Sequence, residues 1–149
     1  MEEVVEASAI QAFKKIGKPI FAEDTGLFIR ALGGFPGTFA SYVHGTIGIA
    51  GVLKLLKNVS DRRAEFRSAI GFCAPEVKLI CFPGIVFGRI SREERGIHGF
   101  GFDTIFKPDG GGDKTFAEMT TDEKNTYSHR AHAVRKFIKW YFKRFISNS

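Results

Sequence analysis

Residues 65–87 have the pattern of two β-strands joined by a tight turn, and this pattern constrains the fold more than any other part of the chain. Alternate residues of the first strand would share one face: Phe66, Ser68, Ile70 and Phe72. Residues 74–77 form the turn, and residues 78–87 return as the second strand. Pro83-Gly84 inside that second strand indicates a bulge or an edge position. The sequence therefore predicts a β-hairpin.

Helical patterns stand on both sides of this hairpin. The other predicted elements are a helix over residues 5–16, a strand over 20–22, a helix over 46–58 and a long C-terminal helix with Ser128 as its N-cap. The order helix, strand, helix, hairpin, helix predicts an α/β fold. We expect a single domain, residues 1–149, with a mixed β-sheet flanked by helices.

Composition limits the class of protein. A chain of 149 residues with 44% hydrophobic residues can fill one core, and its net charge of +6 favours anionic partners. No apolar run approaches the ~20 residues that span a bilayer. The acidic start, residues 1–4, lacks the basic and apolar regions of a signal peptide. Cys73 and Cys81 form no C-x-x-C motif, so we expect a reducing, cytoplasmic setting.

Glu23 and Asp24 place two adjacent carboxylates at the end of the first predicted strand. Neighbouring side chains in a strand face opposite ways, but this constraint loosens at a strand end, where carboxylates often line a ligand crevice. Acids of this kind can hold a hard cation. The alternative is that Asp24 caps a turn with Thr25 and Gly26, and the residues alone favour neither role.

Two later segments carry aromatic and basic groups. Residues 99–103, Gly-Phe-Gly-Phe-Asp, either form a glycine-kinked strand that supplies rings to the core or offer an aromatic face to a purine. Lys124, His129 and Arg130 stand where a polar loop enters the last helix. His129 and His132 also have the spacing of a helical metal pair, although no third ligand is near in sequence. Acids for a cation, together with groups for a phosphorylated base, predict a nucleotide hydrolase.

Four motifs stand in a fixed order: Glu-Asp-Thr-Gly-Leu at 23–27, Gly-Gly-Phe-Pro-Gly at 33–37, Gly-Ile-His-Gly-Phe-Gly-Phe-Asp at 96–103 and Lys-Asn-Thr-Tyr-Ser-His-Arg at 124–130. With this order and spacing the chain resembles the Ham1-like inosine/xanthosine triphosphate pyrophosphatases, from about residue 2 to 142. The resemblance implies a Ham1/Maf-like fold, Mg²⁺ as cofactor, a purine nucleoside triphosphate as substrate and a homodimer. It implies neither nucleic acid nor membrane as a partner.

The resemblance also implies a role for each motif residue. Asp24 would act as the catalytic general base and would share Mg²⁺ with Glu23. The residues that would bind the substrate are Thr25, Phe100, Gly101, Phe102, Asp103, Lys124, His129 and Arg130. Arg130 carries donors only, so it would match the C6 carbonyl of hypoxanthine or xanthine and not the amino group of adenine. Thr104 stands where the family usually has proline.

One family feature has no counterpart in this sequence. The family begins with a strand and a Ser/Thr-Gly-Asn-x-x-Lys loop that grips the triphosphate, and nothing before Asp24 corresponds to this loop. The predicted function is Mg²⁺-dependent hydrolysis of ITP, dITP and XTP to monophosphate and pyrophosphate. The alternatives are a nucleotide-binding homologue with impaired catalysis and a small basic protein that binds nucleic acid. The last is the weakest, because aromatic and basic residues do not interleave on one stripe.

Overall fold

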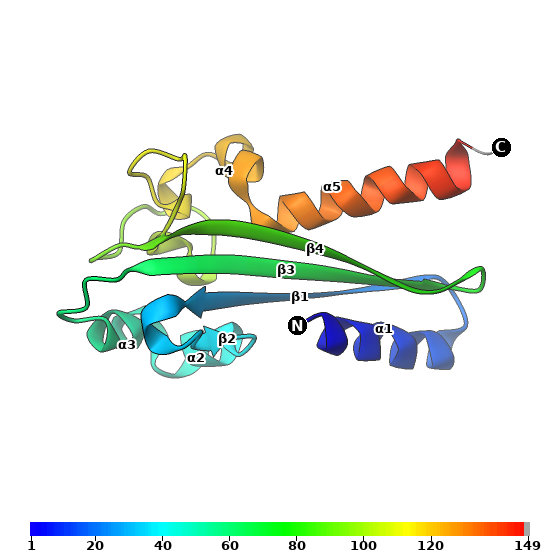
Figure 1. Cartoon of the computed structure of the whole chain (residues 1–149), viewed down its shortest axis with the longest axis horizontal. Coiled ribbons are helices and arrows are strands. Elements are labelled where there is room, and N and C mark those ends of the chain that lie inside the picture. Colours follow the sequence, from blue (N-terminus) through cyan, green and yellow to red (C-terminus); the bar gives the residue numbers. More distant parts are fainter. Residues whose placement is uncertain (148–149) are drawn as a thin grey trace. The chain divides into compact units, whose positions relative to one another are not determined.

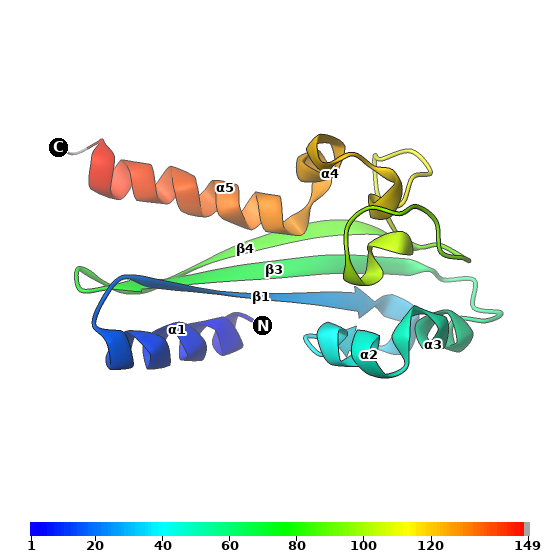
Figure 2. The same ribbon diagram turned by 180° about the vertical axis from the view of Figure 1, so that it is seen from behind.

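The computed structural model of the protein describes residues 1–147. Its helices are α1 (Glu2–Ile16), α2 (Ala40–Thr46), α3 (Gly48–Leu55), α4 (Thr121–Tyr127) and α5 (His129–Tyr141). Short helical turns follow at η1 (Arg30–Leu32), η2 (Gly101–Thr104), η3 (Phe116–Glu118) and η4 (Phe142–Ile146). The strands are β1 (Ile20–Ile29), β2 (Pro36–Gly37), β3 (Arg63–Ala74), β4 (Val77–Ile90) and β5 (Phe106–Pro108). Figures 1 and 2 show the ribbon from opposite sides.

The strands form a sheet in the order β2-β1-β3-β4-β5. β1 pairs antiparallel with β2, and β4 pairs antiparallel with β5. Figure 1 shows β1 and β4 running in one direction and β3 in the other. The α/β class, the flanking helices and the C-terminal helix are confirmed, and the sheet differs from the predicted mixed arrangement in being antiparallel. The reason is that α2 and α3 return the chain to the end of the sheet where β1 stops, so that β3 runs back beside it.

β1 is longer than the sequence pattern predicts, since it continues past Asp24 to Ile29. Its second half pairs with β2, where Leu27 lies opposite Gly37. Gly26 permits this close pairing, because a Cβ at that position would lie 2.7 Å from the carbonyl oxygen of Gly37. Glu23 and Asp24 therefore lie inside a strand and not at its end.

The predicted hairpin is confirmed, since β3 ends at Ala74 and β4 begins at Val77. The first helix also ends as its sequence indicates, because Gly17 follows it in the left-handed conformation with φ 69°. No helix within residues 1–147 is both long and apolar enough to cross a membrane.

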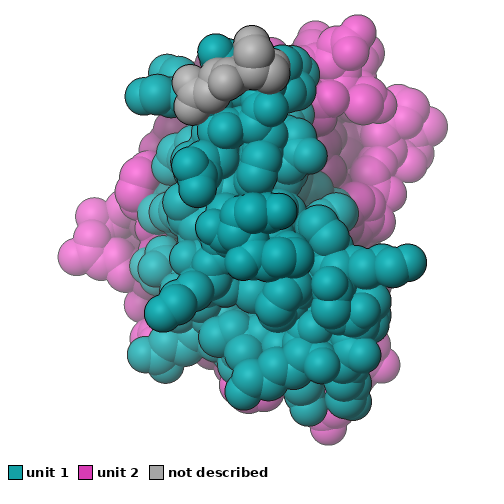
Figure 3. Space-filling view, turned by 90° about the vertical axis from the view of Figure 1, so that its right-hand side faces the viewer, with its two compact units in different colours: residues 1–25, 67–85, 129–149 teal, residues 26–66, 86–128 magenta. Residues whose placement is uncertain are grey.

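Two compact units divide the chain, and Figure 3 colours them separately. Unit 1 consists of Met1–Thr25, Arg67–Ile85 and His129–Ser149, and unit 2 consists of Gly26–Phe66 and Val86–Ser128. The strands β1, β3 and β4 each contribute residues to both units. The division therefore does not test the predicted single domain, which stays a prediction.

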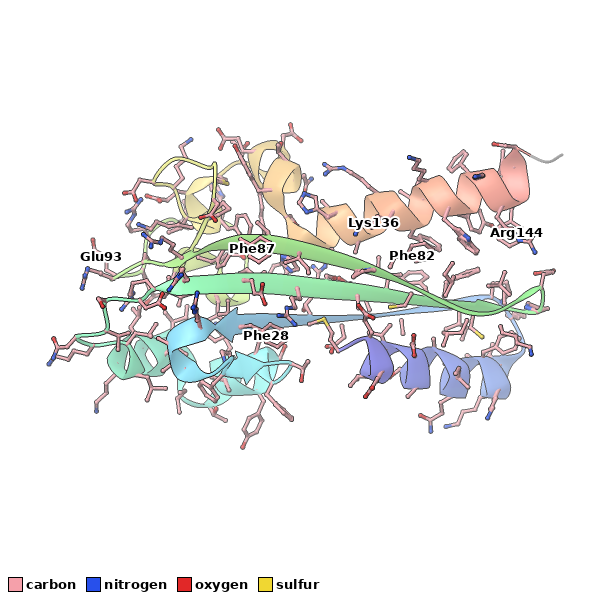
Figure 4. The ribbon with its side chains drawn as sticks, viewed as in Figure 1. Phe28, Phe82, Phe87, Glu93, Lys136 and Arg144 are labelled. Atoms are coloured by element: carbon pink, nitrogen blue, oxygen red, sulfur yellow. The ribbon has the colours of Figure 1, made fainter. Side chains whose placement is uncertain are left out.

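In unit 1, α1 and α5 cover opposite faces of the strands (Figure 1). Gly71 lets α1 approach β3, because a Cβ there would lie 2.6 Å from Val5 Cγ1. On the other face, Ile70 and Phe82 pack against Ala133 of α5, and Figure 4 shows Phe82 between β4 and that helix. The successive residues Ile70 and Gly71 of β3 thus face different helices, α5 and α1, as strand alternation requires.

In unit 2, a separate core forms around aromatic residues. Phe106 and Phe116 are fully buried, and their ring centroids lie 5.2 Å apart. Phe66 contacts the Phe106 ring at 4.6 Å. The buried Arg62 guanidinium donates to three backbone carbonyls, those of Ile90, Leu56 and Ser91. These bonds join the end of α3 to the end of β4, from which the glycine-aromatic segment departs.

Candidate functional site

Glu23 and Asp24 point to opposite faces of the sheet, because they are neighbours inside β1. Glu23 lies on the α5 side, where its carboxylate accepts a hydrogen bond from Ser68 Oγ at 3.2 Å and pairs with Arg130 Nε at 2.5 Å. Alternation places the half-buried Asp24 on the other face and returns Thr25 to the face of Glu23. This divergence does not favour one metal ion shared by both carboxylates, and the metal role of Glu23 stays a prediction.

Arg130 lies in the first turn of α5, directly after His129, which is 8% exposed. Gly84 lets this turn lie against β4. A Cβ at Gly84 would collide with the carbonyl oxygen of His129 and would lie 2.6 Å from the backbone nitrogen of Ala133. Gly84 is therefore the point at which the last helix meets β4, whose strand conformation continues through Pro83 and Gly84.

Two side chains of α5 also bond to exposed carbonyls of β4. His132 Nδ1 lies 3.1 Å from the carbonyl oxygen of Ile85, and Lys136 Nζ donates to the carbonyl of Pro83 at 2.7 Å (Figure 4 labels Lys136). These contacts give His132 a structural role. Across residues 1–147, no group of three or more His, Cys, Asp or Glu could hold a metal ion, so the alternative of a helical histidine metal pair gains no third ligand.

The glycine-aromatic segment and Lys124 form the unit 2 part of the predicted site. Asp103 Oδ2 accepts a hydrogen bond from the backbone nitrogen of Phe100 at 3.0 Å and pairs with Lys124 Nζ at 2.5 Å. Lys124 Nζ also lies 5.0 Å from the centroid of the Phe100 ring, within cation–π range. Because Phe100 is 67% exposed, its ring is available to stack on a planar base.

Phe102 has a different environment from Phe100. It is only 3% exposed, and its ring contacts His44 edge-on at 5.3 Å between centroids. Its placement favours the core role that the sequence left open for this residue, so that only its backbone would line a pocket. Gly101 opens η2 with φ 61°, and a Cβ at Gly99 would collide with Asp103 Oδ2. Both glycines allow the chain to close tightly around the Asp103 carboxylate.

Arg95, which no sequence motif marks, holds this segment in place. Its backbone nitrogen donates to the carbonyl of Thr104 at 2.9 Å, which closes the loop between them. Its guanidinium donates to Glu118 Oε2 at 2.8 Å and to Asp113 Oδ2 at 3.0 Å, and Lys107 Nζ donates to Asp113 Oδ1 at 2.8 Å. We call Arg95, Asp113, Glu118 and Lys107 the Arg95 cluster.

The Arg95 cluster changes the acidity of its members. The hydrogen bond from Arg95 lowers the pKa of Glu118 below its usual range, and hydrogen bonds from Lys107 and Arg95 do the same for the pKa of Asp113. The pKa of Arg95 is raised in return, mainly through Glu118. Glu118, Asp113 and Arg95 therefore stay charged near neutral pH and hold the loop between Arg95 and Thr104.

The predicted site residues fall into two groups, one in each unit. Unit 1 contains Glu23, Asp24, Thr25, His129 and Arg130, and unit 2 contains Phe100, Gly101, Phe102, Asp103 and Lys124. Sequence reasoning missed Ser68 and Arg95. Ser68 carried one signal, because it stands among apolar residues on one face of a predicted strand, where a hydroxyl needs a partner.

A divalent metal fits this set of residues only in an open arrangement. Mg²⁺ often binds through one or two carboxylates and completes its shell with water and phosphate oxygens. Asp24 offers one carboxylate, while the Glu23 carboxylate is occupied by Arg130 and Ser68. The residues fit a metal held jointly by Asp24 and a phosphorylated ligand, and not one enclosed by protein ligands alone.

Comparison with known proteins places this arrangement in context. The model of the Ham1 family matches residues 1–140. The chain is 52% identical to a dITP/XTP pyrophosphatase of Methanothermobacter marburgensis over 141 aligned residues. The alignment covers 95% of this chain and 75% of that protein. The chain is 50% identical to a dITP/XTP pyrophosphatase of Pyrococcus horikoshii over 94% of this chain and 74% of that protein. The Ham1 protein of Staphylococcus aureus superposes with a TM-score of 0.89 at 32% identity, over 96% and 77% of the two chains.

Proposed function

The chain belongs to the Ham1 family, and from that premise we propose that it hydrolyses non-canonical purine nucleoside triphosphates (ITP, dITP and XTP) to the monophosphate and pyrophosphate. The observation that carries the proposal is about 50% identity to relatives named dITP/XTP pyrophosphatase, across almost all of this chain. The candidate residues include groups that can bind a nucleotide: the exposed ring of Phe100, the Lys124–Asp103 ion pair and the carboxylate of Asp24.

Asp24 is the proposed general base and the proposed ligand of Mg²⁺. Its carboxylate would take a proton from water as the water oxygen bonds to the α-phosphorus and the bond from that phosphorus to the bridging oxygen breaks. Pyrophosphate then leaves with the bridging oxygen. Bound Mg²⁺ would supply positive charge to the phosphate oxygens. Glu23 was predicted as a second ligand, but its ion pair with Arg130 supports a different role.

The base would be held by groups from the motif segments. Phe100 would stack on the purine, and Asp103, held by Lys124, would accept a hydrogen bond from a ring N–H. Arg130 would donate to the C6 carbonyl. Thr25, Gly101 and His129 would complete the contacts, and Phe102 would contribute its backbone. A homodimer in the cytoplasm is part of the same proposal.

The identity of the products tests this reaction. The chain is incubated with ITP and Mg²⁺, and the products are separated by ion-exchange chromatography. We expect IMP and pyrophosphate in equal amounts. IDP and phosphate would contradict the proposal, because they require attack at the γ-phosphorus. Binding of IMP without turnover would instead support the alternative of a nucleotide-binding homologue with impaired catalysis.

A further inference from the structure

Glu23, Ser68 and Arg130 form a polar chain across three elements of unit 1: β1, β3 and α5. Ser68 Oγ and Arg130 Nε both donate to the same oxygen, Glu23 Oε1, at 3.2 and 2.5 Å. Ser68 is 1% exposed, whereas the side chains of Glu23 and Arg130 are 30% and 42% exposed. The carboxylate is thus fixed from the buried side of the sheet, while solvent and ligands still reach the pair.

The backbone that carries Arg130 is also fixed. Gly84 brings the first turn of α5 into direct contact with β4, and Lys136 and His132 bond to carbonyls on either side of that glycine. An arginine on a helix surface has many rotamers, and ordering them opposes binding. Here the helix end and the Glu23 carboxylate fix the side chain before any ligand arrives.

Glu23 contacts the Nε atom of Arg130, and this choice of atom determines the direction in which the guanidinium points. The guanidinium is a rigid plane, so a hydrogen bond at Nε sets where both Nη groups point. The bond to Glu23 is charge-assisted, a class of hydrogen bond roughly twice as strong as one between neutral groups. A carboxylate paired in this way also has less negative charge to offer a cation, and strand alternation turns it away from Asp24.

We propose that Glu23 is a positioning residue for Arg130, that Ser68 holds the Glu23 carboxylate, and that the pair presents the guanidinium to the C6 carbonyl of a 6-oxopurine. This inference rests on the proposed function, in which Arg130 contacts the base. It assigns Glu23 to base recognition and leaves the metal to Asp24.

The test compares Glu23→Gln and Ser68→Ala with the matched control Glu76→Gln, which changes an exposed residue in the β3–β4 turn. Three quantities are measured on each full chain. The first is the NMR signal of the Arg130 Nε–H, assigned by its absence in Arg130→Lys. The second is the affinity for IMP by calorimetry without metal. The third is the Mg²⁺ concentration that gives half-maximal ITP hydrolysis.

We expect Glu23→Gln to shift the Nε–H signal and to weaken IMP binding about tenfold, the effect of losing one charged hydrogen bond. Ser68→Ala should weaken IMP binding by roughly threefold, since it loosens the carboxylate without removing it. Neither variant should move the Mg²⁺ requirement, and Glu76→Gln should change none of the three quantities.

Two results would overturn the inference. A higher Mg²⁺ requirement in Glu23→Gln with unchanged IMP affinity would make Glu23 a metal ligand. An Nε–H signal that Glu23→Gln leaves unchanged would show that Glu23 does not hold Arg130, whether or not IMP binds. Failure of the proposed function looks different: the unmodified chain would neither bind IMP nor hydrolyse ITP, and the link from the pair to base recognition would fall with it.

Discussion

Asp103 is a nearly buried carboxylate that has one ion-pair partner and one backbone hydrogen-bond donor. Its side chain is 6% exposed, and Lys124, at 19%, approaches the same oxygen as the backbone nitrogen of Phe100. Removing one partner of such a pair leaves a charge that water cannot reach easily, and this costs far more than losing an exposed ion pair. Lys124 should therefore affect stability as well as base binding.

We predict that Lys124→Met lowers the free energy of unfolding by about 2 kcal/mol, because the Asp103 carboxylate loses its counter-charge. The matched control is Lys114→Met, whose partner Glu123 is 45% exposed, and it should change stability by less than about 0.5 kcal/mol. Urea denaturation of both variants measures the difference. Equal stability losses would show that the Asp103–Lys124 pair is not specially important to the fold.

Asp24→Asn should abolish pyrophosphate release while it leaves IMP binding within about twofold of the unmodified chain. The substitution keeps the shape of the side chain but removes both the proton acceptor and the anionic ligand. Asp109→Asn, at an exposed position of unit 2, provides the matched control and should retain full activity. Normal turnover in Asp24→Asn would exclude this carboxylate as the general base.

At the scale of elements, the loop between Arg95 and Thr104 depends on contacts outside itself. The backbone nitrogens of Ile97 and His98 donate to the carbonyl of Ala117, the middle residue of η3. The Arg95 guanidinium fixes the same turn through Glu118, so two sets of bonds hold the segment that presents Phe100 and Asp103. A binding loop held in this way loses little further freedom when a ligand arrives.

The Arg95 cluster should give the protein a pH-dependent stability. Because the pKa of Glu118 is lowered in the folded state, the unfolded state binds a proton first as the pH falls. The stability from this group is present above about pH 4.5, the ordinary value for glutamate, and is lost as the pH falls through the lower folded pKa. Asp113 acts in the same direction.

Arg95→Met tests this dependence. The melting temperature of the variant should lie below that of the unmodified protein at pH 7. This difference in melting temperature should narrow below about pH 4, where the carboxylates become protonated in both proteins. The measurement is a series of thermal melts followed by circular dichroism. A gap that stays constant with pH would mean that Arg95 stabilises the loop by packing and not through its ion pairs.

For the whole molecule, the sequence predicts correctly those elements whose ends depend only on residues near them in the chain. The β3–β4 hairpin follows from alternation and a turn, and the first helix ends at Ile16 as predicted, directly before the left-handed Gly17. The length of β1 was missed because it depends on Gly26 meeting Gly37 of β2. No local pattern could reveal that pairing.

The candidate site was predictable in its residue types but not in its contacts. Glu23 and Arg130 are 107 residues apart, and their ion pair depends on how closely α5 lies on Gly84. Arg95 lies in a charged segment, where a structural guanidinium and a solvated one look the same in sequence. The motif order identified the family, whereas the partners of each charge required the folded chain.

The most direct test of the account is the ratio of kcat/KM for ITP to that for ATP, measured on this chain with Mg²⁺. Arginine donors facing C6 bind a carbonyl and leave an amino group unpaired, so we predict a preference for ITP of well over tenfold. Steady-state rates from pyrophosphate release give the ratio. Equal values for the two nucleotides would contradict the account and point to a general phosphohydrolase.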